Sequence, residues 1–142
     1  MAKSDPARIA PVRLALVAHC AELLDGLRRS APGVLSATVA TTDGLAVAST
    51  LSNKAEVDKL AAMSGSIAAL ASALTRETGH GEPGRVILES SRGHIVSLKV
   101  PASDPDLVLT VVTDNSAVLG KLLWHCRATA DGIAAQAAAP AG

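Results

Sequence analysis

Apolar residues recur at helical spacing through the middle of the chain, in a stretch without charge. Residues 60–75 read LAAMSGSIAALASALT, and charged residues flank this stretch on both sides. The large apolar residues share one helical face: Leu60, Met63, Ile67, Leu70 and Leu74. The opposite face carries only small, neutral residues: Ala61, Ala62, Gly65, Ala69, Ser72 and Ala73.

A surface helix normally has a charged face, and this helix has none. We therefore expect it to be covered on both sides. Its large residues would face the chain's own core, and its small residues would let a second chain approach closely. The alternative cover for the small face is a loop or terminal segment of the same chain, although both tails are polar or rich in alanine.

The same patterning predicts seven further elements. Two are helices, over residues 11–29 and 117–133, and five are strands, over residues 34–40, 45–50, 85–90, 94–100 and 107–113. Asp43-Gly44 between two apolar runs is a strong hairpin signal. Asn53 is expected to cap the central helix, and Asp114 or Ser116 the last one.

The element order α-β-β-α-β-β-β-α predicts an α/β (α+β) sandwich. It consists of one five-stranded, mostly antiparallel sheet with helices on both faces. The chain of 142 residues suffices for one such domain, which we place at residues 8–134. Residues 1–7 are expected to be a flexible N-terminus, and residues 135–142 a disordered Ala/Pro tail.

Composition narrows the function classes. Thirteen basic residues balance thirteen acidic ones, which argues against binding to nucleic acid or to an anionic membrane surface. Trp124 is the only aromatic residue, so aromatic ligand cages and base-stacking platforms are nearly excluded. We find no signal peptide, and no run reaches the roughly 18–20 apolar residues of a membrane span. The sequence therefore predicts a cytoplasmic protein.

The residues that could carry chemistry form no established motif. Gly79, Gly81 and Gly84 match G-x-G-x-x-G, but they lead from a helix into a strand, whereas a dinucleotide site requires the reverse order. The two His-Cys pairs, at residues 19–20 and 125–126, would suit a zinc ion, but both cysteines fall on apolar stripes. Ser90, Ser91 and His94 bracket a turn and lack a nucleophile signature. We predict no catalytic, cofactor-binding or metal-binding residues.

Contact with another protein is the stronger prediction. Arg85 and Ile87 lie in the strand at 85–90, which would be open to pairing if it formed a sheet edge. Two copies related by a two-fold axis could join there and bring their central helices together. The part of Ala61, Gly65 and Ala69 left uncovered would be the docking platform. Trp124 points away from the apolar stripe of the last helix, so it is either a partner contact or packed on the first helix or the tail.

Three stretches of the chain, together with the Ala-rich central helix, resemble the roadblock family, which includes a dynein light chain and the bacterial MglB-type regulators. The stretches are GVLSATVATTDGLAVAS (33–49), GEPGRVILESSRGHIVSLKV (81–100) and LVLTVVTDNSAVLGKL (107–122), and their most specific parts are the hairpin Asp43-Gly44-Leu45 and the strand that runs into Asp114. The resemblance covers about residues 8–133. It implies a longin-like fold that dimerises through the central helix and the strand after it, giving a ten-stranded sheet.

The resemblance also implies a function. Members of this family lack a catalytic centre and serve as platforms for Ras-like small GTPases or as scaffolds, and bacterial members sometimes act with a sensor-kinase-like protein. We therefore expect a homodimeric adaptor that modulates the nucleotide cycle of a bacterial small GTPase. The alternatives are a generic scaffold and a profilin-like or PAS-like small-molecule sensor. A sensor needs a roomy cavity, which an Ala-rich core without Phe or Tyr does not favour.

Overall fold

The structure, a computed structural model, describes residues 6–137 as three helices and five strands in the predicted order. Their bounds are α1 Pro6–Ser30, β1 Val34–Thr41, β2 Ala46–Ser49, α2 Lys54–Glu77, β3 Val86–Ser90, β4 Gly93–Lys99, β5 Leu107–Thr113 and α3 Leu119–Ala137. α1 and α3 both reach beyond the predicted domain limits at residues 8 and 134. The rest of the predicted flexible ends, residues 1–5 and 138–142, lies outside the described residues.

All five strands belong to one antiparallel sheet in the order β2-β1-β5-β4-β3. This confirms the predicted fold class. β1 and β5 occupy the middle of the sheet and are almost entirely buried, which fits strands covered on both faces. β2 and β3 form the two edges, so β3 has a strand neighbour, β4, on one side only.

Local sequence signals place the hairpin and the start of the central helix as predicted. Gly44 adopts a φ of 94° between β1 and β2, a conformation that glycine enters at little cost, and its N–H donates to the carbonyl of Thr41 at 2.9 Å. Asn53 caps α2, because its side-chain oxygen accepts a hydrogen bond from the N–H of Glu56 at 3.1 Å.

The glycine-rich segment after α2 is a helix terminator. Gly79 has a φ of 70°, its N–H donates to the carbonyl of Arg76, and the N–H of His80 donates to the carbonyl of Thr75 at 2.7 Å. These two bonds define a Schellman motif, which ends a helix at a glycine. The chain then enters β3, so this segment caps the end of a helix and does not face the start of one.

The predicted cap of the last helix is wrong. α3 begins at Leu119, later than Asp114 or Ser116 would place it. Asp114 closes the preceding turn instead, because its Oδ1 accepts hydrogen bonds from the hydroxyl of Ser116 and from the Ser116 N–H at 2.8 Å. These bonds hold the pKa of the Asp114 carboxyl below its usual value of 3.8.

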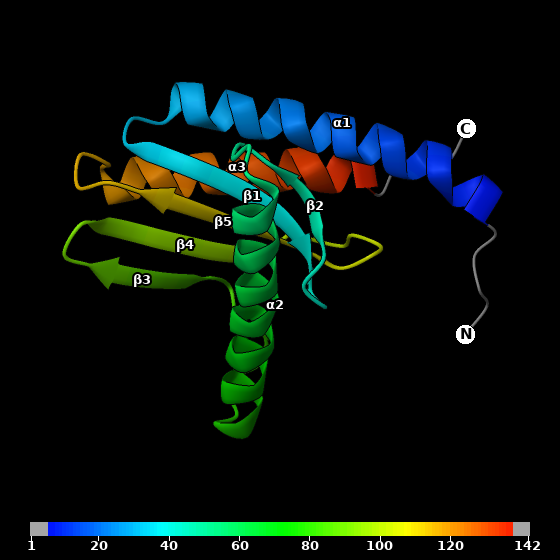
Figure 1. Cartoon of the computed structure of the whole chain (residues 1–142). Helices are drawn as coiled ribbons and strands as arrows, with labels where there is room; N and C mark the ends of the chain where they lie inside the picture. The colour runs from blue at the N-terminus through cyan, green and yellow to red at the C-terminus, as the bar shows by residue number, and fades with distance from the viewer. Residues whose placement is uncertain (1–5, 138–142) are drawn as a thin grey trace.

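Helices cover both faces of the sheet (Figure 1). α1 and α3 lie together on one face, where leucines and valines from both helices and from β1, β4 and β5 form the main core. Cys20 of α1 and Cys126 of α3 belong to this core. α2 crosses the other face, and its C-terminal half extends past the β3 edge (Figure 1).

The contact between α2 and the sheet contains buried hydroxyl groups. Thr110 of β5 donates a hydrogen bond to the Oγ of Ser64 at 2.8 Å, and it lies 3.5 Å from the Oγ of Ser97 on β4. Ser64 in turn donates to the carbonyl of Leu60 at 2.8 Å. Because buried polar groups are stable only when they are paired, these bonds fix where α2 crosses the sheet.

Candidate interaction surface

The side of α2 that packs on the sheet is the small one. Ala61 is fully buried, and Ser64, Gly65 and Ala68 are buried beside it. A Cβ atom on Gly65 would lie 2.8 Å from the carbonyl oxygen of Thr42, too close for an ordinary contact. Small residues are therefore needed here so that the helix backbone can approach the β1–β2 turn of the same chain.

This packing corrects the predicted interface. We expected Ala61 and Gly65 to face a second chain, but both are covered by their own sheet and offer no surface to a partner. Three other predicted positions, Ala62, Ala69 and Ala73, are exposed, and Ser72 is half-buried. These four remain available for contact with another molecule.

The large apolar residues of α2 face solvent, whereas we expected them to face the core. Met63, Leu70 and Leu74 are 54%, 69% and 62% exposed, and Leu60 and Ile67 are half-buried. We call these five residues the α2 stripe. The reason for the error is that both sides of the helix are apolar, and the close polar contact at Ser64 selects the small side for the sheet.

The α2 stripe has an apolar row beside it on the sheet. Leu88 of β3 pairs with Ile95 of β4, which pairs with Val112 of β5. Ile95 lies two residues from Ser97, which faces α2, so this row lies on the α2 face of the sheet. Leu88 is exposed, and Ile95 and Val112 are half-buried. The reason is that α2 crosses the strands near the ends farther from the β3–β4 turn and leaves this row uncovered.

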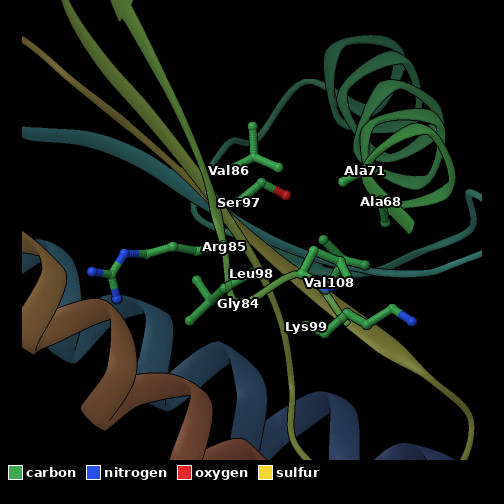
Figure 2. A pocket seen from close by; sticks show the side chains of 10 residues that line it. Ala68, Ala71, Gly84, Arg85, Val86, Ser97, Leu98, Lys99 and Val108 are labelled. Atoms are coloured by element: carbon green, nitrogen blue, oxygen red, sulfur yellow. The ribbon is translucent and has the colours of Figure 1, made fainter. Parts of the chain in front are cut away.

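The β3 edge presents side chains to both faces. Figure 2 shows Val86 pointing toward α2 and Arg85 pointing to the other face, toward α1 and α3. Arg85 is exposed, and Val86 and the predicted interface residue Ile87 are half-buried. Since β3 has no second strand neighbour within residues 6–137, its outer edge is open to pairing.

The space between α2 and the sheet is too small for a ligand. Its cavity measures about 20 Å³ and is lined by Ala68, Ala71, Val86, Ser97, Val108 and their neighbours (Figure 2). Such a volume holds about one water molecule, whereas small-molecule sites measure about 300–1,000 Å³. Nothing in this space favours the sensor alternative.

Trp124 projects from α3 into solvent and is 68% exposed. Its indole contacts the ring of the adjacent His125 edge-on, with centroids 5.1 Å apart. The alternative that it packs on α1 is therefore wrong. Of the predicted tail, residues 135–137 belong to α3 itself, and residues 138–142 lie outside the described part of the chain.

The residues considered for chemistry have structural roles. Burial raises the pKa of the Cys20 thiol to about 11 and that of Cys126 to about 12, so neither is a ready thiolate ligand or nucleophile. His19 contacts the backbone carbonyl of Gly132 at 3.3 Å. Within residues 6–137, no three His, Cys, Asp or Glu side chains come together as a metal site would require.

Ser90, which was considered as a nucleophile, has a structural role. Its hydroxyl donates to the carbonyl of Gly93 and so stabilises the β3–β4 turn.

The exposed apolar side chains of α2 are expected to be covered by a membrane or by another protein. Among the described helices, α2 alone is long and apolar enough to cross a membrane by length and composition, with a mean hydropathy of 1.3. Its small side, however, is hydrogen-bonded to the sheet through Ser64, and a membrane-spanning helix would lose that bond. The stripe and the adjacent β3 edge therefore indicate a surface for contact with another protein.

Three helices around an antiparallel sheet, with an exposed apolar stripe beside an open edge strand, define a small α/β domain suited to protein–protein contact. A family model described as the Roadblock/LC7 domain matches residues 20–113, and the chain belongs to this family. The predicted resemblance is thereby confirmed. No curated protein sequence matches the chain.

Several solved structures share the fold. A Roadblock/LC7 domain from Streptomyces avermitilis has a TM-score of 0.74 at 18% identity, over 80% of this chain and 92% of that one. The gliding protein MglB from Thermus thermophilus has a TM-score of 0.74 at 20% identity, over 87% and 91%. MglB from Myxococcus xanthus has a TM-score of 0.75 at 15% identity, over 95% and 92%.

The sequence prediction missed the residues that form the exposed apolar surface. It placed the helical part of the interface on the small side of α2, and it did not include Leu70 or Leu74. The useful signal was the pair of glycines at residues 44 and 65, which permits close packing of the helix on the turn. That signal can be read only once the hairpin is known to pack against the helix.

Proposed function

We propose that this chain forms a homodimer that binds a Ras-like small GTPase and modulates its nucleotide cycle, without catalysing a reaction itself. The observation that carries the dimer is the exposed α2 stripe beside the open β3 edge. Membership of the Roadblock/LC7 family and similarity in fold to the MglB proteins support the regulatory role. The proposal places the protein in the cytoplasm, where small GTPases act.

The two apolar surfaces complement each other across a two-fold axis at β3. α2 extends past β3, so its C-terminal half would lie over the sheet of the second copy (Figure 1). There the row formed by Leu88, Ile95 and Val112 is left uncovered by that copy's own helix. The sheet-facing side of that half would pack on this row, while Leu70 and Leu74, which point away from the sheet, would lie beside the α2 of the second copy, so both surfaces would leave water.

The sequence of β3 selects one register for the pairing. Opposed residues in an antiparallel pair point to the same face, so a two-fold axis must pass through a residue position. An axis at Ile87 places Ile87 opposite its own copy and Val86 opposite the partner's Leu88. It also places Arg85 opposite the partner's Glu89, which gives two opposite-charge pairs per dimer.

The neighbouring registers are worse. An axis at Leu88 would set Ile87 opposite the partner's Glu89, and an axis at Val86 would set Arg85 opposite the partner's Ile87. Each places a charge against an apolar side chain and forms no ion pair. We therefore propose the register centred on Ile87.

The third side of α2 would form the GTPase platform. Ala62, Ala69 and Ala73 stay exposed after α2 has packed on its own sheet, and they lie apart from the stripe that the second copy would cover. Small side chains would let the loops of a GTPase approach the helix backbone. The regulator would then act by positioning those loops, and it need not supply an arginine finger.

A binding experiment tests this proposal. The purified protein would be titrated with each Ras-like small GTPase of its own organism, loaded with GDP or with a non-hydrolysable GTP analogue. We expect tighter binding in one nucleotide state and a changed rate of hydrolysis or nucleotide exchange. Equal absence of binding in both states would refute the regulatory role and leave a dimeric scaffold. Light scattering on the protein alone checks the dimer separately.

A further inference from the structure

A second apolar surface lies at the β2 end of the molecule. A groove of about 510 Å³ runs between the N-terminal half of α1 and the β1–β2 hairpin, and it is lined by Leu14, Leu16, Val17, Thr41, Leu45, Ala46, Val47, Asp58 and Pro105. Leu14 and Leu45 are 70% and 59% exposed, so the groove is open to solvent. Its volume lies in the range of sites that enclose several side chains or a small ligand.

Acidic residues surround this groove. Asp58 lines it directly and is also paired with Lys54, whose Nζ lies 3.2 Å from its Oδ2, and Asp104 and Asp106 flank the lining residue Pro105. Asp43 lies in the β1–β2 turn, which is joined to the same loop by a hydrogen bond from the N–H of Thr42 to the carbonyl of Asp106 at 3.1 Å. An apolar groove with a rim of aspartates fits an apolar side chain that is flanked by cations.

The chain itself carries such a group on α3. Trp124 is exposed between Gly120 and Ala128, one helical turn away on either side, so the indole stands clear of its neighbours. Lys121 and Arg127 are exposed on either flank. An exposed tryptophan with flanking cations has the composition of an interface hot spot.

Trp124 cannot reach the groove of its own chain. Lys121 lies beside Ala31 and Pro32, at the C-terminal end of α1. The groove uses Leu14 and Val17, and the 14 residues of helix from Val17 to Ser30, next to Ala31, span about 20 Å. The two complementary surfaces therefore lie at opposite ends of the α1–α3 layer, and only different molecules can bring them together.

We propose that Trp124 of one molecule inserts into the β2-end groove of another, with Lys121 and Arg127 meeting the aspartates of its rim. The contact joins two different surfaces, so it repeats head to tail and builds open chains or rings. The groove lies at the β2 edge, opposite the β3 edge of the sheet, and Trp124 projects from α3, so neither surface uses the backbone of β3. It does not depend on the dimer proposed above, and it would link such dimers into longer assemblies.

Sedimentation velocity at rising protein concentration tests this contact. For the wild type we expect the average mass to rise above that of the smallest species, and to fall back in high salt, which screens the charged rim. Trp124→Ala and Leu45→Glu should each stop the growth. Leu35→Glu is the matched control, because Leu35 is 54% exposed at the other end of β1 and should leave assembly unchanged.

Mixing the two variants gives the sharpest result. Trp124→Ala keeps an intact groove and Leu45→Glu keeps an intact tryptophan, so an equimolar mixture should assemble although neither variant does so alone. Trp124 is the only tryptophan, and its fluorescence should therefore shift to shorter wavelength as assembly proceeds. A wild type that never exceeds its smallest species, growth that survives Trp124→Ala, or a mixture that stays unassembled would each overturn the proposal.

Discussion

Gly65 lies so close to the β1–β2 turn that a Cβ atom on it would be 2.9 Å from the amide nitrogen of Gly44. Both contacts of that hypothetical Cβ, with Gly44 and with the carbonyl oxygen of Thr42, involve backbone atoms, which cannot move aside as a flexible side chain would. The α2 helix is therefore held against its own hairpin at a distance that only glycine permits. This contact decides which side of the helix remains for partners.

The first prediction concerns Gly65→Ala. In an exposed helix this change would stabilise the fold by about 0.5–1 kcal/mol, but here we expect a loss of about 1–3 kcal/mol because α2 must move off the turn. Urea denaturation measures the difference. Gly26→Ala in α1 is the control: a Cβ there meets no atom within 4 Å, so its free energy of unfolding should rise by about 0.5–1 kcal/mol. Stabilisation by both changes would show that the close contact is wrong.

The same contact explains how far the sequence could predict this molecule. Hairpin and cap signals such as Asp43-Gly44 and Asn53 depend on neighbouring residues, and they placed most elements within a few residues. The orientation of α2 could not be found in that way, because Leu70 and Ala61 are both apolar and lie on different sides of one helix. The choice between them depends on Ser64 meeting Thr110, 46 positions away in the sequence.

The interface prediction failed for a related reason. Hydrophobicity alone favours burying leucine under the sheet, yet the α2 face of the sheet carries Ser97 and Thr110, and the turn admits only a glycine. The close approach of α2 to the turn and the hydrogen bond of Ser64 therefore place the small side of α2 on the sheet, even though the leucine side would bury more apolar area. A Gly65→Glu substitution, which would test dimerisation if Gly65 faced a second chain, would instead disrupt the fold of a single chain.

The second prediction tests the β3 register. Arg85→Glu or Glu89→Arg alone would place like charges opposite each other twice per dimer, at about 0.2–1 kcal/mol for each pair lost and a similar penalty for each repulsion. We expect the dimer dissociation constant to rise about tenfold or more for either variant. The double variant should restore it, because it exchanges the partners of both pairs. Arg92→Glu, in the β3–β4 turn, is the control and should have no effect. Analytical ultracentrifugation gives the dimer dissociation constants of the wild type and the four variants.

The third prediction concerns the α2 stripe. Leu70 is exposed in the single chain, so Leu70→Glu should change the free energy of unfolding of the monomer by no more than about 0.5 kcal/mol. In the dimer the carboxylate would be buried against apolar residues, and we expect monomers at micromolar concentration by light scattering. A variant that remains fully dimeric would show that the stripe is not covered by a second copy.

The fourth prediction separates the GTPase platform from the dimer. Ala69→Glu changes an exposed residue on the third side of α2, so the protein should remain dimeric while its affinity for the GTPase falls by at least about tenfold, or 1.4 kcal/mol. Lys59→Glu, near the start of the same helix, introduces the same side chain away from the platform and serves as the control. If Ala69→Glu binds the GTPase like the wild type, the platform lies elsewhere on the dimer.

The fifth prediction follows from the buried thiols of α1 and α3. Burial raises the pKa of Cys20 to about 11 and that of Cys126 to about 12, from an ordinary value of 9.0. Folding therefore favours the protonated thiols, and their contribution to stability is complete below pH 9. It is lost as pH rises above 9 toward 11 and 12, because the unfolded chain releases these protons first. Thermal melts between pH 8 and 10.5 should show the melting temperature falling, and this fall should be smaller in Cys20→Ala and Cys126→Ala, even though each variant starts from lower stability. An equal fall in all three proteins would mean that other groups cause it.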